Sequence, residues 1–156
     1  MKINYCPQCG TKTYSKHLGD DFVQICPECK RSFQDFFYTC AIIVCVNEIG
    51  KIAVIKQSYG KDMYVLVAGF ARPLERLEDT CVREIKEELG LDTKSITYLG
   101  TYPMEKTENL MVAYKCHVSG FIKLSSEVKE VKFVSKEEAL ELLKDAKLAY
   151  KVVKNL

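Results

Sequence analysis

The sequence has 156 residues, of which 47% are hydrophobic and 28% are charged, and its formal net charge is +2. A chain of this length can bury the core of one domain with a small appendage. Its near-neutral charge argues against a dedicated nucleic-acid-binding protein. No apolar run approaches the length of a membrane-spanning helix and no signal-peptide pattern opens the chain, so we expect a cytoplasmic protein.

Residues 1–34 contain four of the eight cysteines, arranged as two Cys-x-x-Cys pairs. Four thiolates can bind one Zn²⁺ tetrahedrally, and metal binding would stabilise a segment that is too small to fold by apolar burial. A redox-active Cys-x-x-Cys motif is the other interpretation, and the repeated pairing disfavours it. We therefore predict a zinc ribbon with the ligands Cys6, Cys9, Cys26 and Cys29, and we expect His17 to be a surface residue.

The role of this ribbon has more than one interpretation. Its default role is structural, and binding to nucleic acid or to a partner subunit is the alternative. A homodimer contact is expected because the ribbon offers four apolar side chains, Tyr5, Phe22, Ile25 and Phe33. The other four cysteines are scattered through apolar surroundings, which favours a reducing compartment over a secreted disulfide scaffold.

From residue 35 onward the pattern changes to that of a second domain, residues 35–156. Runs of aromatic, β-branched and alternating residues predict its strands: 36–46 and 52–55 as a hairpin, 63–68, 96–102, 110–118 and 128–134. Ser135 begins a capping box that opens a helix through Leu143, with a basic helical tail to about Val153. His117 lies on the more polar side of its strand and is interpreted as a surface residue.

Residues 69–91 form the most informative stretch, a loop and a short helix. Asp79 or Thr80 can cap the start of the helix, and Gly90 can supply the left-handed residue that ends it. One arc of the helix is apolar, with Cys81, Val82, Ile85 and Leu89. A second arc carries three carboxylates, those of Glu84, Glu87 and Glu88.

Three like charges on one arc have two explanations. On a solvated face their repulsion costs only about 0.2–0.5 kcal/mol per pair. In a pocket each pair costs roughly 1–3 kcal/mol, which a bound Mg²⁺ or Mn²⁺ would reverse because these hard ions prefer carboxylate oxygens. The helix alone leaves both explanations open.

The spacing around the helix resembles a known motif. Gly69, Glu75 and then Arg83-Glu84-Ile85-x-Glu87-Glu88-x-Gly90-Leu91 fit the Nudix box, G-x5-E-x7-R-E-U-x-E-E-x-G-U with U aliphatic, at every specified position. The chain therefore resembles the Nudix hydrolases. This resemblance implies an α+β fold, an αβα sandwich with a mixed β-sheet. It also implies a Mg²⁺- or Mn²⁺-dependent enzyme that cleaves phosphoric anhydride bonds in nucleoside diphosphate derivatives.

The resemblance also implies roles for individual residues. Glu84 and Glu88 would hold the catalytic metal, Glu87 would orient a metal or water, and Gly69 would let the backbone approach a metal or phosphate. Arg83 and Glu75 would form an internal pair that braces the loop. Glu127 resembles the acidic residue that several Nudix enzymes place before their last strand, and Glu130 is its competitor as general base.

A narrower resemblance concerns the substrate. A four-cysteine ribbon followed by Ala68-Gly69-Phe70 is similar to the NADH pyrophosphatase branch, which implies NAD(H) or ADP-ribose as substrate. The chain departs from that branch at residues 101–107, which read Thr-Tyr-Pro-Met-Glu-Lys-Thr in place of Ser-Gln-Pro-Trp-Pro-Phe-Pro. It also has Leu74 where the family usually has glycine.

The alternative function is a non-catalytic nucleotide- or nucleic-acid-binding module on a Nudix scaffold with a zinc ribbon. Such a module would tolerate the loss of box carboxylates, and this chain keeps all of them. In either case we expect the loops at 58–62 and 102–109 to recognise the ligand, and their tyrosines can either stack on a base or simply pack.

Overall fold

A computed structural model describes residues 2–156 and divides the chain into two compact units. The first unit ends at Tyr38 and the second begins at Thr39. In the part of the chain that is described, no helix is long and apolar enough to span a membrane.

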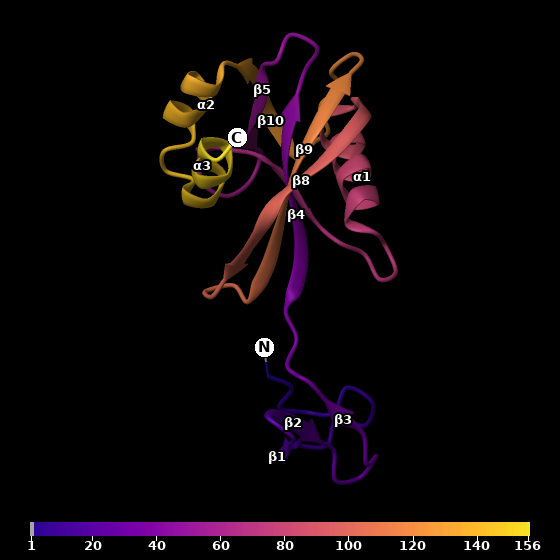
Figure 1. The fold of residues 1–156 in the computed structure, drawn as a ribbon. Helices are drawn as coiled ribbons and strands as arrows, with labels where there is room; N and C mark the ends of the chain where they lie inside the picture. Colours follow the sequence, from indigo (N-terminus) through magenta and orange to yellow (C-terminus); the bar gives the residue numbers. More distant parts are fainter. Residues whose placement is uncertain (1) are drawn as a thin grey trace. The chain divides into compact units, whose positions relative to one another are not determined.

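The first unit is a small three-stranded antiparallel sheet in the order β1-β2-β3 (Figure 1). Its strands are β1 (Tyr14–Leu18), β2 (Asp21–Ile25) and β3 (Ser32–Phe33). Every residue of β1 is exposed. The buried hydrophobic side chains of this unit are those of Cys6, Val23 and Cys26. Apolar burial is therefore too small to stabilise the unit by itself.

The second unit contains a seven-stranded sheet in the order β10-β5-β4-β9-β8, with β6 paired to β5 and β7 paired to β4. The strands are β4 (Tyr38–Val46), β5 (Ile52–Gln57), β6 (Tyr64–Val65), β7 (Val67–Phe70), β8 (Asp92–Met104), β9 (Asn109–Ser119) and β10 (Val128–Val134). β4 and β9 run in the same direction (Figure 1), whereas β8 and β9 are antiparallel. The sheet is therefore mixed.

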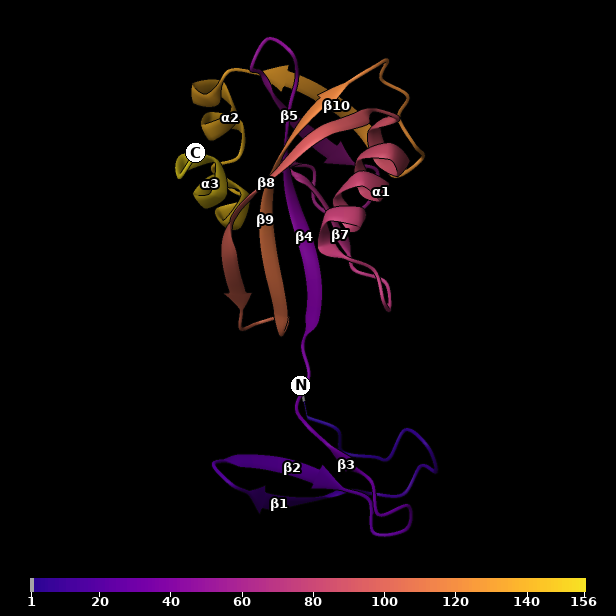
Figure 2. The ribbon, with the colours of Figure 1, turned by 45° about the vertical axis from the view of Figure 1, so that its right-hand side comes forward.

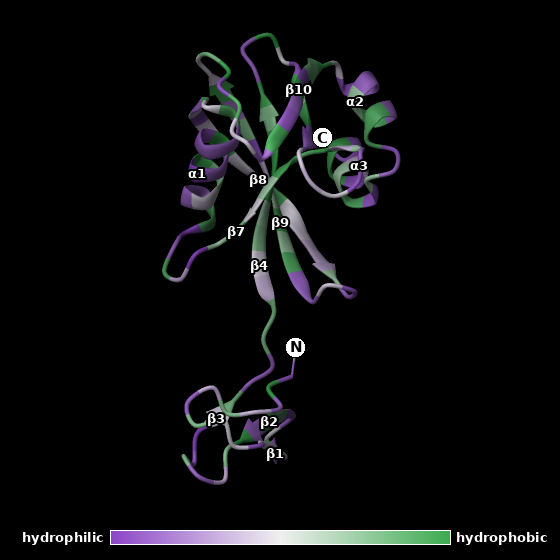
Figure 3. Ribbon diagram, turned by 180° about the vertical axis from the view of Figure 1, so that it is seen from behind, coloured by the Kyte–Doolittle hydropathy of each residue, from purple (hydrophilic) through white to green (hydrophobic). Residues whose placement is uncertain are grey.

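Helices cover both faces of this sheet. α1 (Leu77–Leu89) lies on one side, and α2 (Lys136–Leu142) and α3 (Lys147–Lys154) lie on the other (Figures 1 and 2). Alternate residues of β4 point to opposite faces, so Ile43 joins the core under α1 while Ile42 and Val44 join the core under α2 and α3. Hydrophilic and hydrophobic residues share α2 and α3, as their purple and green segments show (Figure 3). The predicted αβα sandwich is confirmed.

The predicted helix ends are correct in part. Gly90 ends α1 with a φ of 73°, as predicted, and Ser135 accepts a hydrogen bond from the Glu138 N–H at 3.2 Å as the cap of α2. The prediction that Asp79 or Thr80 caps α1 is wrong, because the helix already begins at Leu77 and Arg76 is the N-cap. The Thr80 hydroxyl instead donates to the Glu75 carboxylate at 2.9 Å. Val82, predicted to lie on the apolar arc, is exposed.

Two predicted elements are divided in the structure. The strand expected at 63–68 becomes β6 and β7, because the chain changes its pairing partner from β5 to β4 at Leu66. The helical tail after Leu143 becomes a separate helix, α3, because a turn closed by Ala146 N–H donating to Leu143 O at 2.9 Å interrupts the helical pattern.

Candidate active site

Arg83 is the centre of the loop-helix structure formed by residues 69–91. Its Nε and Nη2 donate to the two oxygens of Glu75 at 2.7 and 2.9 Å, a bidentate pair in which the side chains are 15% and 14% exposed. This guanidinium, assisted by the Arg72 N–H and the Thr80 hydroxyl, lowers the pKa of Glu75 to about 2. The expected bracing pair is therefore present, and Glu75 stays ionised.

The remaining donors of Arg83 position the carboxylate arc. Nη2 donates to the carbonyl of Phe70 at 2.9 Å, which ties the end of β7 to α1. Nη1 donates to Glu84 and, at 3.1 Å, to Glu87. Arg72 adds a bond to Glu87 at 3.2 Å. One arginine therefore orients three of the four box glutamates.

Leu74 in the same loop has a φ of 66°, which is in the left-handed region. This is the position where the family usually has glycine, the residue that adopts such a φ without steric cost. A leucine there is strained by roughly 1 kcal/mol, and its side chain is fully exposed. The bond between Glu75 and Arg83 holds the loop directly after this residue.

Glu88 is the most buried of the three carboxylates, with 4% of the residue exposed. Among residues 2–156, no hydrogen-bond partner reaches its Oε2. Burial, followed by the charges of Glu84, Glu127 and Glu87, raises the pKa of Glu88 to about 8. Burial also raises the pKa of Glu84. A carboxylate oxygen without a partner beside other acids is an arrangement that a cation would stabilise.

Glu127 reaches this arc from a separate loop. The loop is attached to the end of α1, because Lys123 N–H donates to Leu89 O at 2.8 Å and Ser125 N–H donates to Glu88 O at 3.2 Å. A further bond from Ser58 N–H to Glu127 O at 2.8 Å holds the end of the loop. Glu130, the competitor of Glu127, lies on β10 and pairs with Lys132 at 3.4 Å.

These side chains line one cavity of about 650 Å³. Its lining residues are Cys40, Gln57, Tyr59, Ala68, Gly69, Phe70, Ala71, Arg72, Pro73, Arg83, Glu84, Glu87, Glu88 and Glu127. It thus brings together Gly69, the three arc glutamates and Glu127, while Glu130 and His117 are not among the lining residues. Cys40, which the sequence analysis did not single out, is placed here by its pairing with Phe70 across β4 and β7.

Gly69 is required by the packing of Glu84. A Cβ at this position would lie 1.9 Å from Glu84 Oε1, far inside van der Waals contact. We expect Gly69→Ala to displace the Glu84 carboxylate and to lower kcat by about 100-fold, the loss typical of a misplaced active-site group. Steady-state kinetics with the preferred substrate measures this.

Gly50→Ala is the matched control for this substitution. Gly50 lies in the β4–β5 turn with a φ of 76° and has no atom within 4 Å of a built Cβ. This variant should lose some thermal stability and keep the kcat of the wild type. Equal kcat values in the two variants would contradict the role of Gly69.

The cysteines of the first unit form a second cluster. The sulfur atoms of Cys6, Cys9, Cys26 and Cys29 all lie within 4.8 Å of one another. Each Cys-x-x-Cys pair is a turn followed by a residue with positive φ, Gly10 at 75° and Lys30 at 59°. Within residues 2–156 this is the only group of three or more acidic, His or Cys ligands that are this close together. The oxygen atoms of the cavity carboxylates do not lie as close together as these sulfur atoms. Glu84 and Glu87 instead accept hydrogen bonds from Arg83.

His17 stands apart from the sulfur cluster. It is exposed on β1, its Nδ1 lies 3.1 Å from the carbonyl oxygen of Gly19, and its ring contacts Phe22. The interpretation of His17 as a surface residue therefore agrees with its position.

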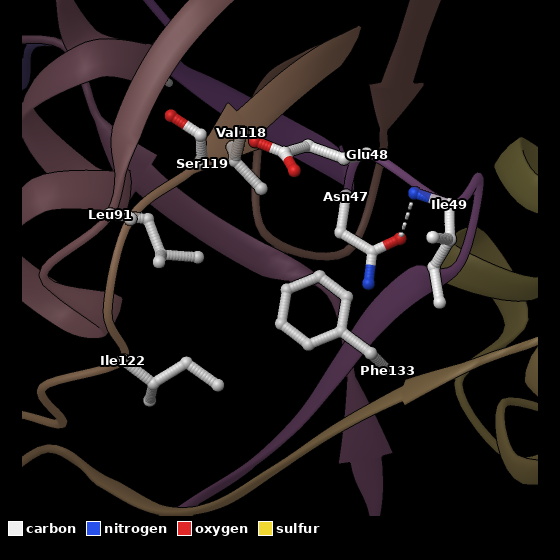
Figure 4. A pocket seen from close by; sticks show the side chains of 9 residues that line it. Asn47, Glu48, Ile49, Leu91, Val118, Ser119, Ile122 and Phe133 are labelled. Carbon is white, nitrogen blue, oxygen red and sulfur yellow. Dashed lines mark hydrogen bonds between the residues drawn. The ribbon is translucent and has the colours of Figure 1, made fainter.

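A further cavity, of about 340 Å³, contains none of the predicted site residues (Figure 4). Figure 4 shows Leu91, Ile122 and Phe133 among the side chains around it. Asn47 also lines it, and its Oδ1 accepts hydrogen bonds from Ile49 N–H at 3.2 Å and Lys51 N–H at 2.9 Å. The Asn47 amide oxygen therefore stabilises the β4–β5 turn.

Comparison with known proteins identifies a family for the unit that contains the loop and helix at residues 69–91. The NUDIX domain family matches residues 37–156 of the chain. The chain belongs to the NUDIX family.

Several relatives of this NUDIX chain carry one name. A protein of Vibrio atlanticus named NAD-capped RNA hydrolase NudC is 32% identical over 121 residues, which are 77% of this chain and 44% of the relative. A Schizosaccharomyces pombe protein named NAD-capped RNA hydrolase is 28% identical over 166 residues, which are 94% of this chain and 44% of the relative. The chain thus spans less than half the length of these relatives.

Solved structures show the same fold. A NUDIX hydrolase from Nitrosomonas europaea aligns with a TM-score of 0.72 at 20% identity, covering 90% of this chain and 82% of that one. An Ap4A hydrolase from C. elegans aligns with a TM-score of 0.59 at 19% identity, and the alignment covers 74% of this chain and 92% of that one.

Proposed function

We propose that the chain is a divalent-metal-dependent Nudix pyrophosphohydrolase that cleaves the diphosphate bridge of a nucleoside diphosphate derivative. The observation that carries this proposal is the buried Glu88 carboxylate, which has no hydrogen-bond partner for Oε2 among the described residues and shares a cavity with Glu84 and Glu127. Holding these acids close together carries an electrostatic cost that a bound divalent cation would offset.

The donor set fits Mg²⁺ or Mn²⁺. Glu84, Glu88 and Glu87 would hold the metal, because all their donors are hard carboxylate oxygens. When bound, such an ion neutralises phosphate charge and lowers the pKa of a bound water. Gly69 has no side chain, and the Glu84 carboxylate occupies the space that a Cβ would fill.

The residues of the chain would then carry out an ordinary hydrolysis. Glu127 accepts a proton from the attacking water, and Glu87 orients that water. The water oxygen bonds to one phosphorus atom, the bridging P–O bond breaks, and the bridge oxygen leaves with the other phosphate. Arg83 keeps Glu84 and Glu87 in place throughout. The products are two monophosphates.

The substrate class that we propose is an NAD-type dinucleotide or ADP-ribose. A second, mostly apolar cavity of about 460 Å³ shares Gln57 and Ala68 with the carboxylate cavity, so a nucleoside has room beside the diphosphate. The names of the relatives add NAD-capped RNA as a candidate. A nucleic-acid substrate, which the near-neutral charge argued against, therefore belongs in the experiment.

We further propose that Cys6, Cys9, Cys26 and Cys29 bind a structural Zn²⁺. The convergence of four sulfurs in a unit with little buried apolar surface supports this assignment. The homodimer stays a prediction, and Tyr5 and Phe22 of this unit are exposed and available for it. The cytoplasmic location stays a prediction.

A product analysis tests the proposed function. NADH, NAD⁺, ADP-ribose, NAD-capped RNA, Ap4A and nucleoside triphosphates are incubated with Mg²⁺ or Mn²⁺ and separated by chromatography. We expect nicotinamide mononucleotide and AMP, or a 5′-monophosphate RNA, with NADH modestly favoured over ADP-ribose. Cleavage of triphosphates alone would contradict the substrate class. Nucleotide binding with no turnover would support the non-catalytic module instead.

A further inference from the structure

The loop between β5 and β6 brings Tyr59 to the carboxylate cavity. Both ends of this loop are held, since Ser58 N–H donates to Glu127 O at 2.8 Å and Asp62 pairs with Lys56 at 3.1 Å. Gly60, with a φ of 83°, makes the turn between them. Tyr59 lines the same cavity as Glu88 and remains 58% exposed.

The hydroxyl group of Tyr59 has one hydrogen-bond partner among the described residues. Its Oη accepts a hydrogen bond from Gln57 Nε2 at 3.2 Å. A phenol has one proton to donate besides its acceptor lone pairs, and among residues 2–156 no acceptor takes this proton. Burial and the charges of Glu127, Glu88 and Glu84 raise the pKa of Tyr59. The phenol therefore stays protonated and acts as a neutral donor beside the acids.

A neutral donor suits this position better than a cation would. A lysine beside these carboxylates would form ion pairs with them and compete with a bound metal. The Tyr59 O–H bears no net charge, so it leaves the acids free and still offers a hydrogen bond to an anion. The anion that enters this cavity, on the proposed function, is the diphosphate of the substrate.

We propose that Tyr59 is a substrate-binding residue whose hydroxyl donates a hydrogen bond to a non-bridging phosphate oxygen of the bound diphosphate. This inference rests on the proposed function and adds to it a donor that lies outside the Nudix box. Gln57 is the positioning residue, because its amide donates to the Tyr59 oxygen and leaves the phenol proton for another acceptor.

Tyr59→Phe tests the inference, because it removes the hydroxyl and keeps the ring. We expect kcat/KM for the preferred substrate to fall on the order of 10- to 100-fold, as for the loss of a hydrogen bond to a charged group. Most of the loss should appear in KM, because the bond forms to the bound substrate as well as to the transition state. Tyr59→Ala should have a kcat/KM only slightly lower than that of Tyr59→Phe.

Tyr98→Phe is the matched control. Tyr98 is 59% exposed, its hydroxyl lies 2.7 Å from Thr101 Oγ1, and it is not among the residues that line the cavity. Its substitution should leave KM and kcat unchanged. Calorimetric binding of α,β-methylene-ADP with Mg²⁺ adds a readout that is independent of turnover, and Tyr59→Phe should weaken this binding by a similar factor.

The outcomes separate this inference from the proposed function. A wild-type protein that hydrolyses none of the diphosphates would overturn the proposed function. An active wild type with an unchanged KM and unchanged analogue affinity in Tyr59→Phe would overturn the role of Tyr59 alone. A large further loss in Tyr59→Ala, with Tyr59→Phe near wild type, would show that the ring binds the substrate and that the hydroxyl does not.

Discussion

Glu88→Gln should lower kcat at least about 100-fold in saturating Mg²⁺ or Mn²⁺. The substitution keeps the size of the side chain and removes its negative charge, at a site that is 4% exposed and beside Glu84 and Glu127. Because a neutral amide is a poor ligand for hard cations, the metal should be held weakly or displaced. Metal-dependent turnover of the preferred substrate measures the effect.

Glu130→Gln is the control for this result. Glu130 is also an acid that sequence reasoning selected, but it pairs with Lys132 on β10 and is absent from the lining of the cavity. Glu130→Gln should retain the kcat of the wild type. Glu127→Gln should have a lower kcat, because the proposed general base is removed. Near-normal turnover of Glu88→Gln in saturating metal would mean that Glu88 is not a metal ligand.

The same Glu88 variant should also change the pH dependence of stability in the presence of a chelator. The pKa of Glu88 rises from 4.5 to about 8 on folding, so the folded state loses stability as the pH rises through this window. Above about pH 8 the free energy of unfolding is lower by roughly 5 kcal/mol than it is below pH 4.5. A glutamine has no such loss, so Glu88→Gln should have the higher Tm at pH 8.5 and a similar Tm at pH 5.

Thermal unfolding of the two proteins across this pH range measures the difference. A Tm difference that is the same at both pH values would show that Glu88 does not titrate with a raised pKa. Repeating the measurement with Mg²⁺ should stabilise the wild type more than Glu88→Gln, which reports on metal binding without any assay of activity.

Cys26→Ser should abolish zinc binding and unfold the first unit. Cys26 is fully buried, its sulfur lies 3.6 Å from that of Cys9, and it accepts a hydrogen bond from the Cys29 N–H at 3.3 Å. Structural zinc contributes about 10–16 kcal/mol to the folding of small zinc domains. The buried apolar surface of this unit cannot replace that contribution.

Metal analysis and amide exchange measure this outcome separately. Zinc should fall to a trace, and the amides of β1 and β2 should lose protection from exchange, while metal-dependent hydrolysis by the second unit persists. Cys116→Ala, in the core under α1, is the control and should retain its zinc. Full zinc stoichiometry in Cys26→Ser would contradict the four-cysteine site.

Local sequence determines a large part of this protein. Local residue patterns predicted most strands and helices of the second unit, because side-chain direction depends on the local backbone, but they did not predict the strands of the first unit. Gly90 and Ser135 identify helix ends for the same reason, since capping uses residues within one turn. The spacing of Glu84, Glu87 and Glu88 puts them on one arc of α1 before any tertiary contact forms. The two Cys-x-x-Cys pairs likewise predict a metal site without any tertiary information, and their four sulfurs lie within 4.8 Å of one another.

The difference in burial among the glutamates of α1 depends on tertiary structure. Glu88 is buried whereas the Glu87 side chain is 51% exposed, because neighbouring helix positions face different directions and Glu88 lies with Ile85 and Leu89 on the side of α1 that packs against the rest of the unit. The sequence could not decide between Glu127 and Glu130, since the choice depends on the loop that carries Glu127 and on a bulge between Val128 and Glu130 where β10 pairs with β5. Residues 58–59 reach the same cavity through a hydrogen bond to a segment almost seventy positions later. Contacts at such separation follow from chain packing, and no local pattern encodes them.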